Sequence, residues 1–427
     1  MIDFPPKDYI QTKSAVPGIA IYMPKPPEET HQEVVEFHCP QCDGVSAYSA
    51  DNGGLTCTFC GYYEPPQQEV VGKHAEAFEF TVETMERVAH GWGTERKELV
   101  CNRCAARTTF STDMLTHTCP FCGSNQVVQV KAPQDVLRPR FLIPFTVTAE
   151  ECRKKTAVWL QDSWMLPAEL SQLANKARYT PIYIPYWTFD ATTQAKWRAE
   201  VAHQTVRQVY VNGRWQSRTQ TEWRRESGKA VVEFDDLLVT GSQYLSQHLL
   251  RQVQNYDVAA LVPYDASFLA GIQAQAYDVD LDAAWEKGRR AMRTKTKAAC
   301  KGQATSRQMR NFSMDLAFKD ENWRYILMPL YLATYPYGSE TYQVLINGQT
   351  GMIAGSRPAD WKKVLLATAG MMLPAILLGL LTLVLANVPG MDSDYVPLVG
   401  SFAAFAFIVG LIVAIITVTQ AARMDDV

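Results

Sequence analysis

Two long apolar runs stand at the C-terminal end of the chain, VLLATAGMMLPAILLGLLTLVLANV (residues 364–388) and VPLVGSFAAFAFIVGLIVAIITVT (residues 396–419). Between Lys363 and Arg423 the only charged side chains are Asp392 and Asp394, which lie in the short link between the runs. Each run exceeds the roughly 20 residues that a helix needs to cross the hydrocarbon core of a bilayer. Neither run has the polar stripe that is typical of a helix in a soluble domain, which is the alternative interpretation. The sequence therefore predicts a C-terminal two-helix transmembrane hairpin over residues 362–423.

The charges that flank these runs predict the orientation of the hairpin. Lys362 and Lys363 precede the first run and Arg423 follows the second, whereas the link is acidic. Because basic flanks stay on the cytosolic side of a membrane, we expect a multi-pass protein with both termini in the cytosol. The start of the chain, MIDFPPKDYI, has no basic and apolar signal peptide. We therefore expect the long N-terminal part to lie in the cytosol as well.

Small side chains in the second run recur at spacings of three and four residues, at Ala403, Ala406, Gly410, Ala414 and Thr417. Such a stripe lets another helix backbone approach closely, which is how helices associate in lipid. The partner is either the first run or a second copy of the chain, so a homo-oligomer stays open.

Eight of the ten cysteines form an internal repeat with the pattern CxxC, fourteen residues, CxxC. The first unit contains Cys39, Cys42, Cys57 and Cys60, and the second, which begins 62 residues later, contains Cys101, Cys104, Cys119 and Cys122. In a reducing cytosol, clustered thiols bind metal more often than they form disulfides. Four thiolates on two knuckles surround Zn²⁺ tetrahedrally and leave no open coordination position.

This repeat predicts two tandem zinc ribbons, over residues 31–66 and 97–130, with two structural zinc ions per chain. Redox dithiols and iron–sulfur ligation are the alternatives, and both are typically associated with other cysteine spacings. Cys152 and Cys300 lie outside the repeat, and we interpret them as buried core residues.

The remaining sequence predicts a flexible, proline-rich lead over residues 1–30, a connector over residues 67–96 and an α+β cytosolic domain over residues 131–361. Alternating segments indicate antiparallel strands, and Asn212-Gly213 predicts a hairpin turn within residues 196–233. Helices are predicted over residues 149–173, with a break at Pro167, and over residues 246–256 and 281–299. Because proline donates no hydrogen bond to a sheet ladder, the pairs Ile184-Pro185 and Met328-Pro329 predict strand starts or edges.

Charge is distributed unevenly, although the net charge is only −3. Residues 1–136 contain ten Lys and Arg against eighteen Asp and Glu, whereas residues 285–310 contain nine Lys and Arg against Glu286 alone. The basic segment includes Arg289, Arg290, Arg293, Lys295 and Lys297. Three interpretations are open for it: a solvated helix face, a contact with anionic membrane lipid, or a contact with an acidic surface, such as this chain's own N-terminal part.

Three motifs carry a resemblance to a known family: IPYWTFDA (residues 184–191), PLYLATY (residues 329–335) and YQVLINGQTG (residues 342–351). With the paired ribbons and the C-terminal hairpin, they resemble the bacterial membrane-anchored TFIIB-type zinc-ribbon proteins, whose relatives are sometimes labelled primosomal or helicase-like. The resemblance implies that the protein is located in the bacterial inner (cytoplasmic) membrane. It also implies an association with flotillin-like (SPFH) proteins or membrane-stress scaffolds. The helicase label does not fit this chain, because it has no GxxxxGK[ST] loop for an ATP phosphate.

Three functions remain in competition. The first is a membrane-anchored adaptor or scaffold that holds a protein partner at the cytosolic face without catalysis. The second is a nucleic-acid-binding module, which the acidic ribbon region disfavours because phosphate binding needs a basic face. The third is an enzyme whose catalytic residues are dispersed, since the HExxH and GxSxG motifs are absent. We expect the adaptor, with no enzymatic activity.

Overall fold

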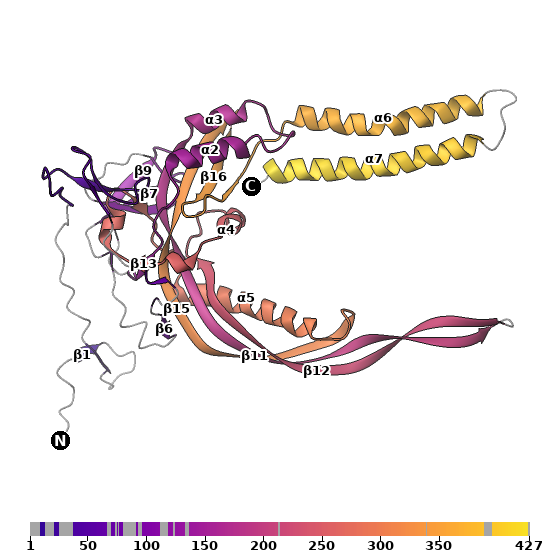
Figure 1. Cartoon of the computed structure of the whole chain (residues 1–427), viewed down its shortest axis with the longest axis horizontal. Helices are drawn as coiled ribbons and strands as arrows, with labels where there is room; N and C mark the ends of the chain where they lie inside the picture. Colours follow the sequence, from indigo (N-terminus) through magenta and orange to yellow (C-terminus); the bar gives the residue numbers. More distant parts are fainter. Residues whose placement is uncertain are drawn as a thin grey trace, which may run out of the picture.

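The computed structural model describes residues 9–12, 21–24, 37–65, 70–72, 75, 77–79, 91–92, 96–111, 118–122, 124–132, 136–211, 214–338, 340–387 and 395–425. Its centre is a sheet built on β11 (Arg178–Val211) and β15 (Met309–Tyr337), which pair antiparallel from Arg178 and Thr334 to Val201 and Met309. In Figure 1 the ribbons lie to one side of this sheet, and two long projections extend to the other side, one from its upper end and one from its lower end.

Side chains of β11 and β15 alternate between two hydrophobic cores, one on each face of the sheet. Tyr183 and Tyr331 belong to the first core, whereas Ile184 and Leu330 belong to the second. Successive residues of a strand point to opposite faces, so an apolar run such as residues 182–187 requires cover on both. The first face is covered by α2 (Ala149–Trp159), α3 (Leu170–Lys176) and α5 (Leu281–Gly302), and the second by α4 (Gln247–Val253).

Ten further strands complete the twelve-stranded sheet in the described part of the chain. They are β6 (Phe78–Glu79), β7 (Arg96–Cys101), β8 (Arg107–Ser111), β9 (Val127–Lys131), β10 (Phe141–Leu142), β12 (Arg214–Thr240), β13 (Val262–Pro263), β14 (Gln273–Ala274), β16 (Glu340–Asn347) and β17 (Ile353–Gly355). Two small sheets stand apart from it. One contains β1 (Tyr9–Thr12) and β2 (Ile21–Pro24), inside the predicted lead, and the other contains β3 (Ser46–Ser49), β4 (Gly54–Cys57) and β5 (Tyr63–Glu64).

Two prolines lie inside the central strands, which corrects the prediction that they mark strand starts or edges. Pro185 pairs with Leu327 in the middle of β11, and Pro329 lies within β15. On the other side of β11 the neighbouring strand changes at Pro185, since β14 pairs up to Tyr183 and β12 pairs from Tyr186. The same change occurs at Pro329, between β10 and β16. Proline is tolerated here because no continuous ladder needs its missing N–H group on that side.

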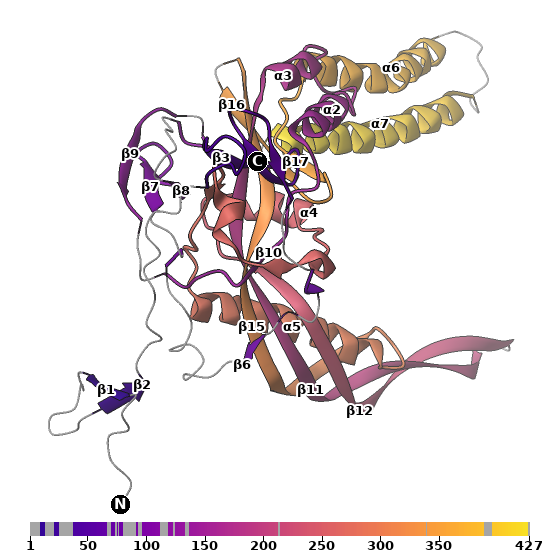
Figure 2. The ribbon, with the colours of Figure 1, turned by 60° about the vertical axis from the view of Figure 1, so that its left-hand side comes forward.

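A two-stranded arm extends the sheet beyond the end of β15. We define the arm as residues 202–211 of β11 and 214–223 of β12, which stay in register up to the pair of Val211 and Arg214. This pairing fits the predicted two-residue turn, whose own residues 212–213 lie outside the described part of the chain. α5 covers only the root of β11 and β12, on the side that faces the C-terminal helices (Figure 2).

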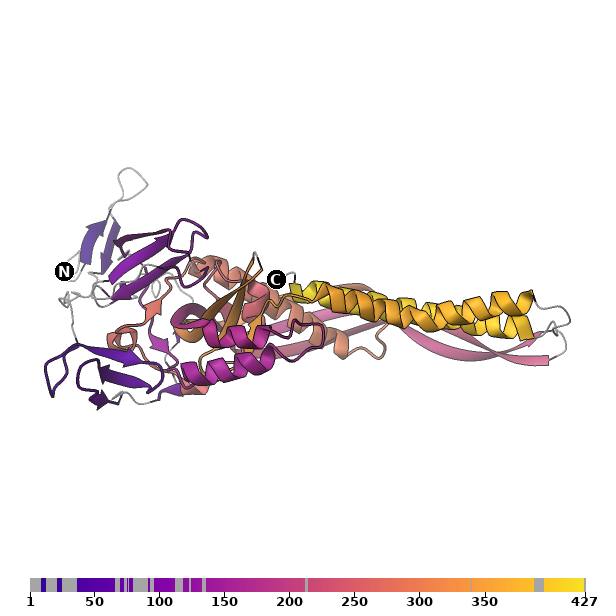
Figure 3. The same cartoon turned by 90° about the horizontal axis from the view of Figure 1, so that it is seen from above.

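The second projection is an antiparallel pair of helices, α6 (Trp361–Ala386) and α7 (Tyr395–Asp425). α6 continues through Pro374 as one helix. The base of the pair is attached to the domain by a small core of Met165, Ala359, Val364 and Ala421. Seen from above, the arm and the helix pair extend in the same direction, away from the ribbons, and reach similarly far (Figure 3).

Candidate metal centres and flanking surfaces

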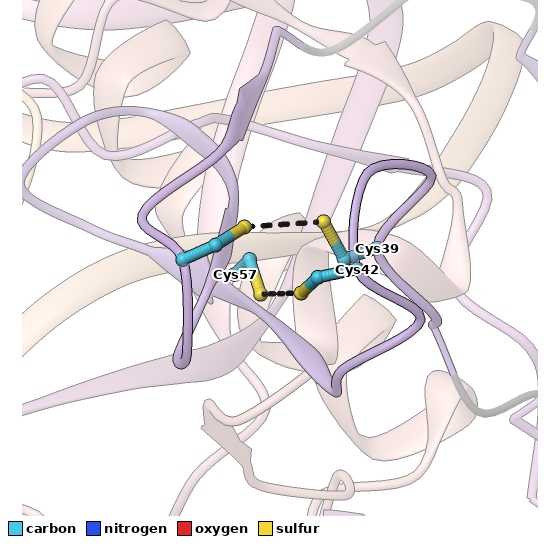
Figure 4. Close-up of side chains that lie close together, drawn as sticks. Cys39, Cys42 and Cys57 are labelled. Carbon is cyan, nitrogen blue, oxygen red and sulfur yellow. Dashed lines mark hydrogen bonds between the residues drawn. The ribbon is translucent and has the colours of Figure 1, made fainter.

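The cysteines of the first ribbon converge from two knuckle loops. Sγ of Cys39 lies 3.6 Å from Sγ of Cys60, and Sγ of Cys42 lies 3.5 Å from Sγ of Cys57. Figure 4 shows Cys39, Cys42 and Cys57 turned toward one another. All four sulfur atoms lie within 4.8 Å of one another. Zn–S bonds of about 2.3 Å in a tetrahedron place the sulfur atoms about 3.8 Å apart, so this group fits a tetrahedral metal ion.

The cysteines of the second ribbon have the same arrangement. Sγ of Cys101 lies 3.6 Å from Sγ of Cys122, and Sγ of Cys104 lies 3.6 Å from Sγ of Cys119. These four sulfur atoms also lie within 4.8 Å of one another. The two four-cysteine groups predicted from the sequence can therefore each hold one metal ion, and neither group needs an additional ligand.

Backbone hydrogen bonds shape each knuckle in the same way. The N–H group of Cys39 donates to Gly44 and that of Asp43 donates back to Cys39, at 2.7 and 2.8 Å. Cys101 and Ala105 repeat this pattern in the second ribbon, at 3.0 and 2.9 Å. The residue after the second cysteine takes a positive φ in three knuckles, at Asp43 (59°), Gly61 (73°) and Ala105 (58°). This left-handed turn brings both sulfur atoms of a CxxC pair to one side of the loop.

Backbone N–H groups also favour the thiolate form in each ribbon. The N–H groups of Cys60 and Phe59 lower the pKa of the Cys57 thiol to about 6. At Cys101, burial raises the thiol pKa, but the N–H groups of Cys104 and Arg103 outweigh it, and the pKa falls to about 7. Hydrogen bonds to the charged form stabilise that form, and a deprotonated sulfur is the form that binds a metal ion.

The two ribbons dock on opposite faces of the central sheet. Tyr48 of the first ribbon enters the first core, where its ring centroid lies 5.3 Å from that of Phe268. Cys101 and Phe121 of the second ribbon enter the other core. The second ribbon also joins the large sheet, because Thr109 of β8 pairs with Ala274 of β14.

The knuckles of the two ribbons differ in the exposure of one phenylalanine. Phe121, in the second knuckle of the second ribbon, is only 5% exposed, and its carbonyl oxygen accepts a hydrogen bond from Gln343 at 3.0 Å. Phe59 has the equivalent position in the first ribbon, and it is 78% exposed. The first ribbon therefore presents to solvent the apolar side chain that the second ribbon buries in the domain.

The two remaining cysteines are buried away from both groups. Cys152 lies on the buried face of α2 in the first core, and Cys300 lies on the buried face of α5, where its Sγ is 3.8 Å from Sδ of Met314. Burial raises the pKa of the Cys152 thiol to about 12. Neither thiol has the exposed, electropositive surroundings of a reactive cysteine.

The basic side chains of α5 lie on two different surfaces. Arg290, Arg293, Lys295 and Lys297 are exposed on the outer face of the helix. Arg289 instead lies against the sheet, with its guanidinium 3.7 Å from Glu321 and 4.7 Å from the ring centroid of Phe318. Lys297 is exposed as well, but its Nζ lies 5.7 Å from the ring centroid of Phe312, so the five predicted residues do not form one solvent-facing group.

The stripe of small residues in α7 faces α6. Gly410 and Thr417 are buried, and Ala403, Ala406 and Ala414 are half-buried between exposed apolar neighbours. A Cβ atom at Gly410 would lie 3.0 Å from the carbonyl oxygen of Met371 in α6. The first helix of the same chain is therefore the neighbour that this stripe meets.

Both C-terminal helices are long and apolar enough to cross a membrane. Their large side chains are exposed, among them Leu366 at 75% and Phe405 at 67%. In the described chain the helix pair is thus not a buried part of the α+β domain, which was the alternative interpretation of these apolar runs. The link over residues 388–394, with both of its aspartates, lies outside the described residues.

Sequence reasoning missed a third group of potential metal ligands, Asp190, Asp235 and Asp236. Arg324 already occupies this group: its guanidinium contacts Asp190 at 3.1 Å and also bonds to Asp236. Asp190 additionally accepts the backbone N–H group of Asp236 at 2.7 Å. We interpret the group as an internal ion network at the bulge of β11. In the sequence, these aspartates were visible only as one acidic residue at position 190 and an acidic pair at positions 235–236, each next to apolar strand residues.

Comparisons with known proteins yield one distant relative. The chain is 22% identical over 338 residues to a Bacillus subtilis protein named "Uncharacterized protein YdjG", and the match covers 78% of this chain and 92% of that protein. No family model matches the chain, and no solved structure matches it.

Proposed function

We propose that this protein is a membrane-anchored adaptor whose two zinc ribbons are structural and whose first ribbon binds a protein partner at the cytosolic membrane face. Following the family resemblance described above, the partner is a flotillin-like (SPFH) or membrane-stress protein. The exposure of Phe59 carries the proposal, because the equivalent Phe121 already shows what such a knuckle binds: an apolar surface of folded protein.

The donor sets support zinc in a structural role. Four thiolates complete the tetrahedral coordination of Zn²⁺, so no position remains for water or substrate. The eight ligands are Cys39, Cys42, Cys57, Cys60, Cys101, Cys104, Cys119 and Cys122. Their metal ions would stabilise the knuckles and have no part in a reaction.

The membrane anchorage is supported by α6 and α7, whose exposed apolar side chains require a lipid or protein environment. In our proposal both helices cross the bacterial inner membrane, with Lys362, Lys363 and Arg423 at the cytosolic side. The domain and both ribbons then lie in the cytosol, where a partner can reach them.

Affinity purification of the full chain from native membranes tests the adaptor role. We expect an SPFH protein to co-purify with the wild type and to be lost with Phe59→Ser, since a truncated apolar anchor at the centre of an interface typically costs more than about 2 kcal/mol. Val158→Ser is the matched control, because Val158 is 72% exposed on α2 and lies outside the knuckle.

Metal analysis of the same samples shows whether the variant is intact. Phe59→Ser should retain both zinc ions, because its side chain is no ligand. Equal recovery of the partner with Phe59→Ser and wild type would contradict a partner site at this knuckle. Recovery of nucleic acid in place of a protein, at physiological salt, would contradict the adaptor role itself.

A further inference from the structure

We infer that the arm, residues 202–211 and 214–223, lies on the anionic headgroups of the bilayer that α6 and α7 cross. The inference rests on the membrane anchorage proposed above and is independent of the adaptor role. It assigns an interaction surface to the part of the fold that contributes least to either hydrophobic core.

The direction of the arm brings it to the membrane. The base of the helix pair is fixed to the domain, since Lys363 Nζ donates to the carbonyl oxygen of Leu166 at 2.8 Å and Arg357 N–H to that of Met424 at 3.0 Å. The arm projects on the same side of the domain and reaches similarly far (Figure 1 and Figure 3). In this arrangement a bilayer crossed by α6 and α7 therefore lies at the same level as the arm.

The hydrocarbon core cannot accept the arm. Its two strands leave the backbone groups of both edges without a ladder partner beyond β15, and each unsatisfied group costs several kcal/mol in lipid. Arg207, Arg214 and Arg218 add charges that are expensive at that depth. In our proposal the arm therefore bends at its root, where β15 begins at Met309 and the sheet narrows to two strands, and follows the membrane surface.

One face of the arm is uncharged and the other carries arginines, as expected for a segment at the interface between membrane and water. In the register of the strands, one face holds no charged residue: Ala202, Gln204, Val206, Gln208, Tyr210, Trp215, Ser217, Thr219, Thr221 and Trp223. Tyr210 and Trp215 pair near the tip with ring centroids 5.2 Å apart, and Trp215 is 68% exposed. Such amphipathic aromatic side chains favour the headgroup level of a bilayer.

The opposite face places two arginines directly across from each other. Arg207 pairs with Arg218 in the register, and like charges in such positions destabilise a hairpin. In the described chain neither forms an ion pair within 4.0 Å, and Glu222, the arm's acidic side chain, is held by Arg224 at 2.9 Å. This face points away from the lipid in our proposal, but the hairpin is thin enough for its charges to act on the membrane surface within about one Debye length. A nearby anionic surface therefore offsets part of this repulsion, and each basic residue close to it adds about 1 kcal/mol of attraction.

A fluorescent amino acid placed on either face of the arm tests the inference. The full chain is incorporated into nanodiscs of phosphatidylcholine alone or mixed with phosphatidylglycerol, with an environment-sensitive fluorophore at Gln208 or at Gln216. Both glutamines are exposed on neighbouring rungs, but Gln208 lies on the uncharged face and Gln216 on the arginine face. We expect a blue shift of the emission at position 208 in anionic nanodiscs, and none at position 216.

The same shift should disappear in the double variant R207Q/R218Q and in high salt, because charge attraction is screened. No shift in anionic nanodiscs, or an equal shift in uncharged ones, would overturn the inference. A shift that depends on two copies per nanodisc would indicate self-association, and one that requires added DNA or RNA would indicate nucleic acid. Either result would also overturn it. Incorporation into nanodiscs depends only on α6 and α7. A protein that does not enter the nanodiscs would contradict the membrane anchorage, whereas a protein that enters them without an emission shift would contradict only the contact of the arm with lipid.

Discussion

Arg324 is the residue whose removal should destabilise the α+β domain most directly. Its side chain is 7% exposed and is held between Asp190 and Asp236. Arg324→Met leaves two buried carboxylates unpaired, which typically costs about 3–5 kcal/mol. We expect a thermal midpoint roughly 10 °C lower in detergent. Arg310→Met is the control, since it removes an exposed ion pair with Glu200 that solvent screens and that contributes little to stability.

The pH dependence of the Arg324→Met variant provides a second test. Burial raises the pKa of Asp236, and the charge of Arg324 opposes this rise. Without Arg324, the pKa of Asp236 in the folded protein should rise further above its value in the unfolded chain. The free energy of unfolding of the variant then falls as the pH rises from the unfolded-state pKa to the folded-state pKa. The loss should therefore be smaller at pH 5 than at pH 8. A loss that is independent of pH would contradict an electrostatic cause.

Gly61 is predicted to contribute through its backbone conformation alone, because it avoids the strain of a positive φ that Asp43 and Ala105 accept in two other knuckles. Its φ is +73°, and a Cβ atom there would meet no other atom within 4 Å. Gly61→Ala should cost about 1–2 kcal/mol because an L-residue is strained in the left-handed region. When a chelator removes zinc, each ribbon should contribute one kinetic phase. We expect the phase of the first ribbon to be faster in the variant than in the wild type. Gly302→Ala, equally open but without a positive φ, should leave both phases unchanged.

At the scale of elements, close contact of α6 and α7 depends on Gly410. Gly410→Val would place a branched side chain against Met371 and Met372, where even a Cβ lies 3.0 and 3.2 Å from their atoms. Separation of the helices should lower the yield of a disulfide between Thr382→Cys and Gly400→Cys, as measured by mass spectrometry. Gly370→Val is the control because its site is open. An unchanged yield with Gly410→Val would show that the contact is dispensable.

The sequence predicted some elements well because their signals are local. The apolar runs indicated α6 and α7, and the helix break near Pro167 matches the gap between α2 and α3. The 34-residue length of β11 was not predictable in this way. Its neighbours change along the strand and its bulge at Asp190 depends on Arg324, more than 130 positions later. Such long-range pairing leaves no periodic pattern in one segment.

The metal ligands were predictable and the surfaces around them were not. CxxC spacing alone assembles both four-cysteine groups. The segments CTFC and CPFC, however, place Phe59 in solvent and Phe121 in a core although their patterns are nearly identical. The exposure of the phenylalanine depends on how the whole ribbon packs against the sheet. The local sequence of the knuckle does not indicate this packing.

At the scale of the whole molecule, we expect two zinc ions per chain by metal analysis. Cys39→Ser and Cys101→Ser should each remove one ion. Structural zinc supplies about 10–16 kcal/mol of apparent binding free energy in small ribbons. Cys101→Ser should lower the thermal midpoint of the domain more, since Cys101 belongs to the second core and Cys39 to neither. One ion or none in the wild type, or iron with visible absorbance, would contradict the assignment.

Hydrogen bonds also connect the base of the helix pair, through α2, to the first ribbon. Asp360 N–H donates to the carbonyl oxygen of Met165 in the loop between α2 and α3 at 2.7 Å, and Arg357 donates to that of Trp159, the last residue of α2, at 2.9 Å. At the other end of α2, the N–H group of Ala149 donates to Asp51 of the first ribbon at 2.7 Å. If α6 crosses a membrane as we propose, a tilt of this helix, such as a change in bilayer thickness imposes, would act through α2 on the ribbon that presents Phe59. Lateral tension in the membrane and occupancy of the knuckle would then be coupled through one short helix.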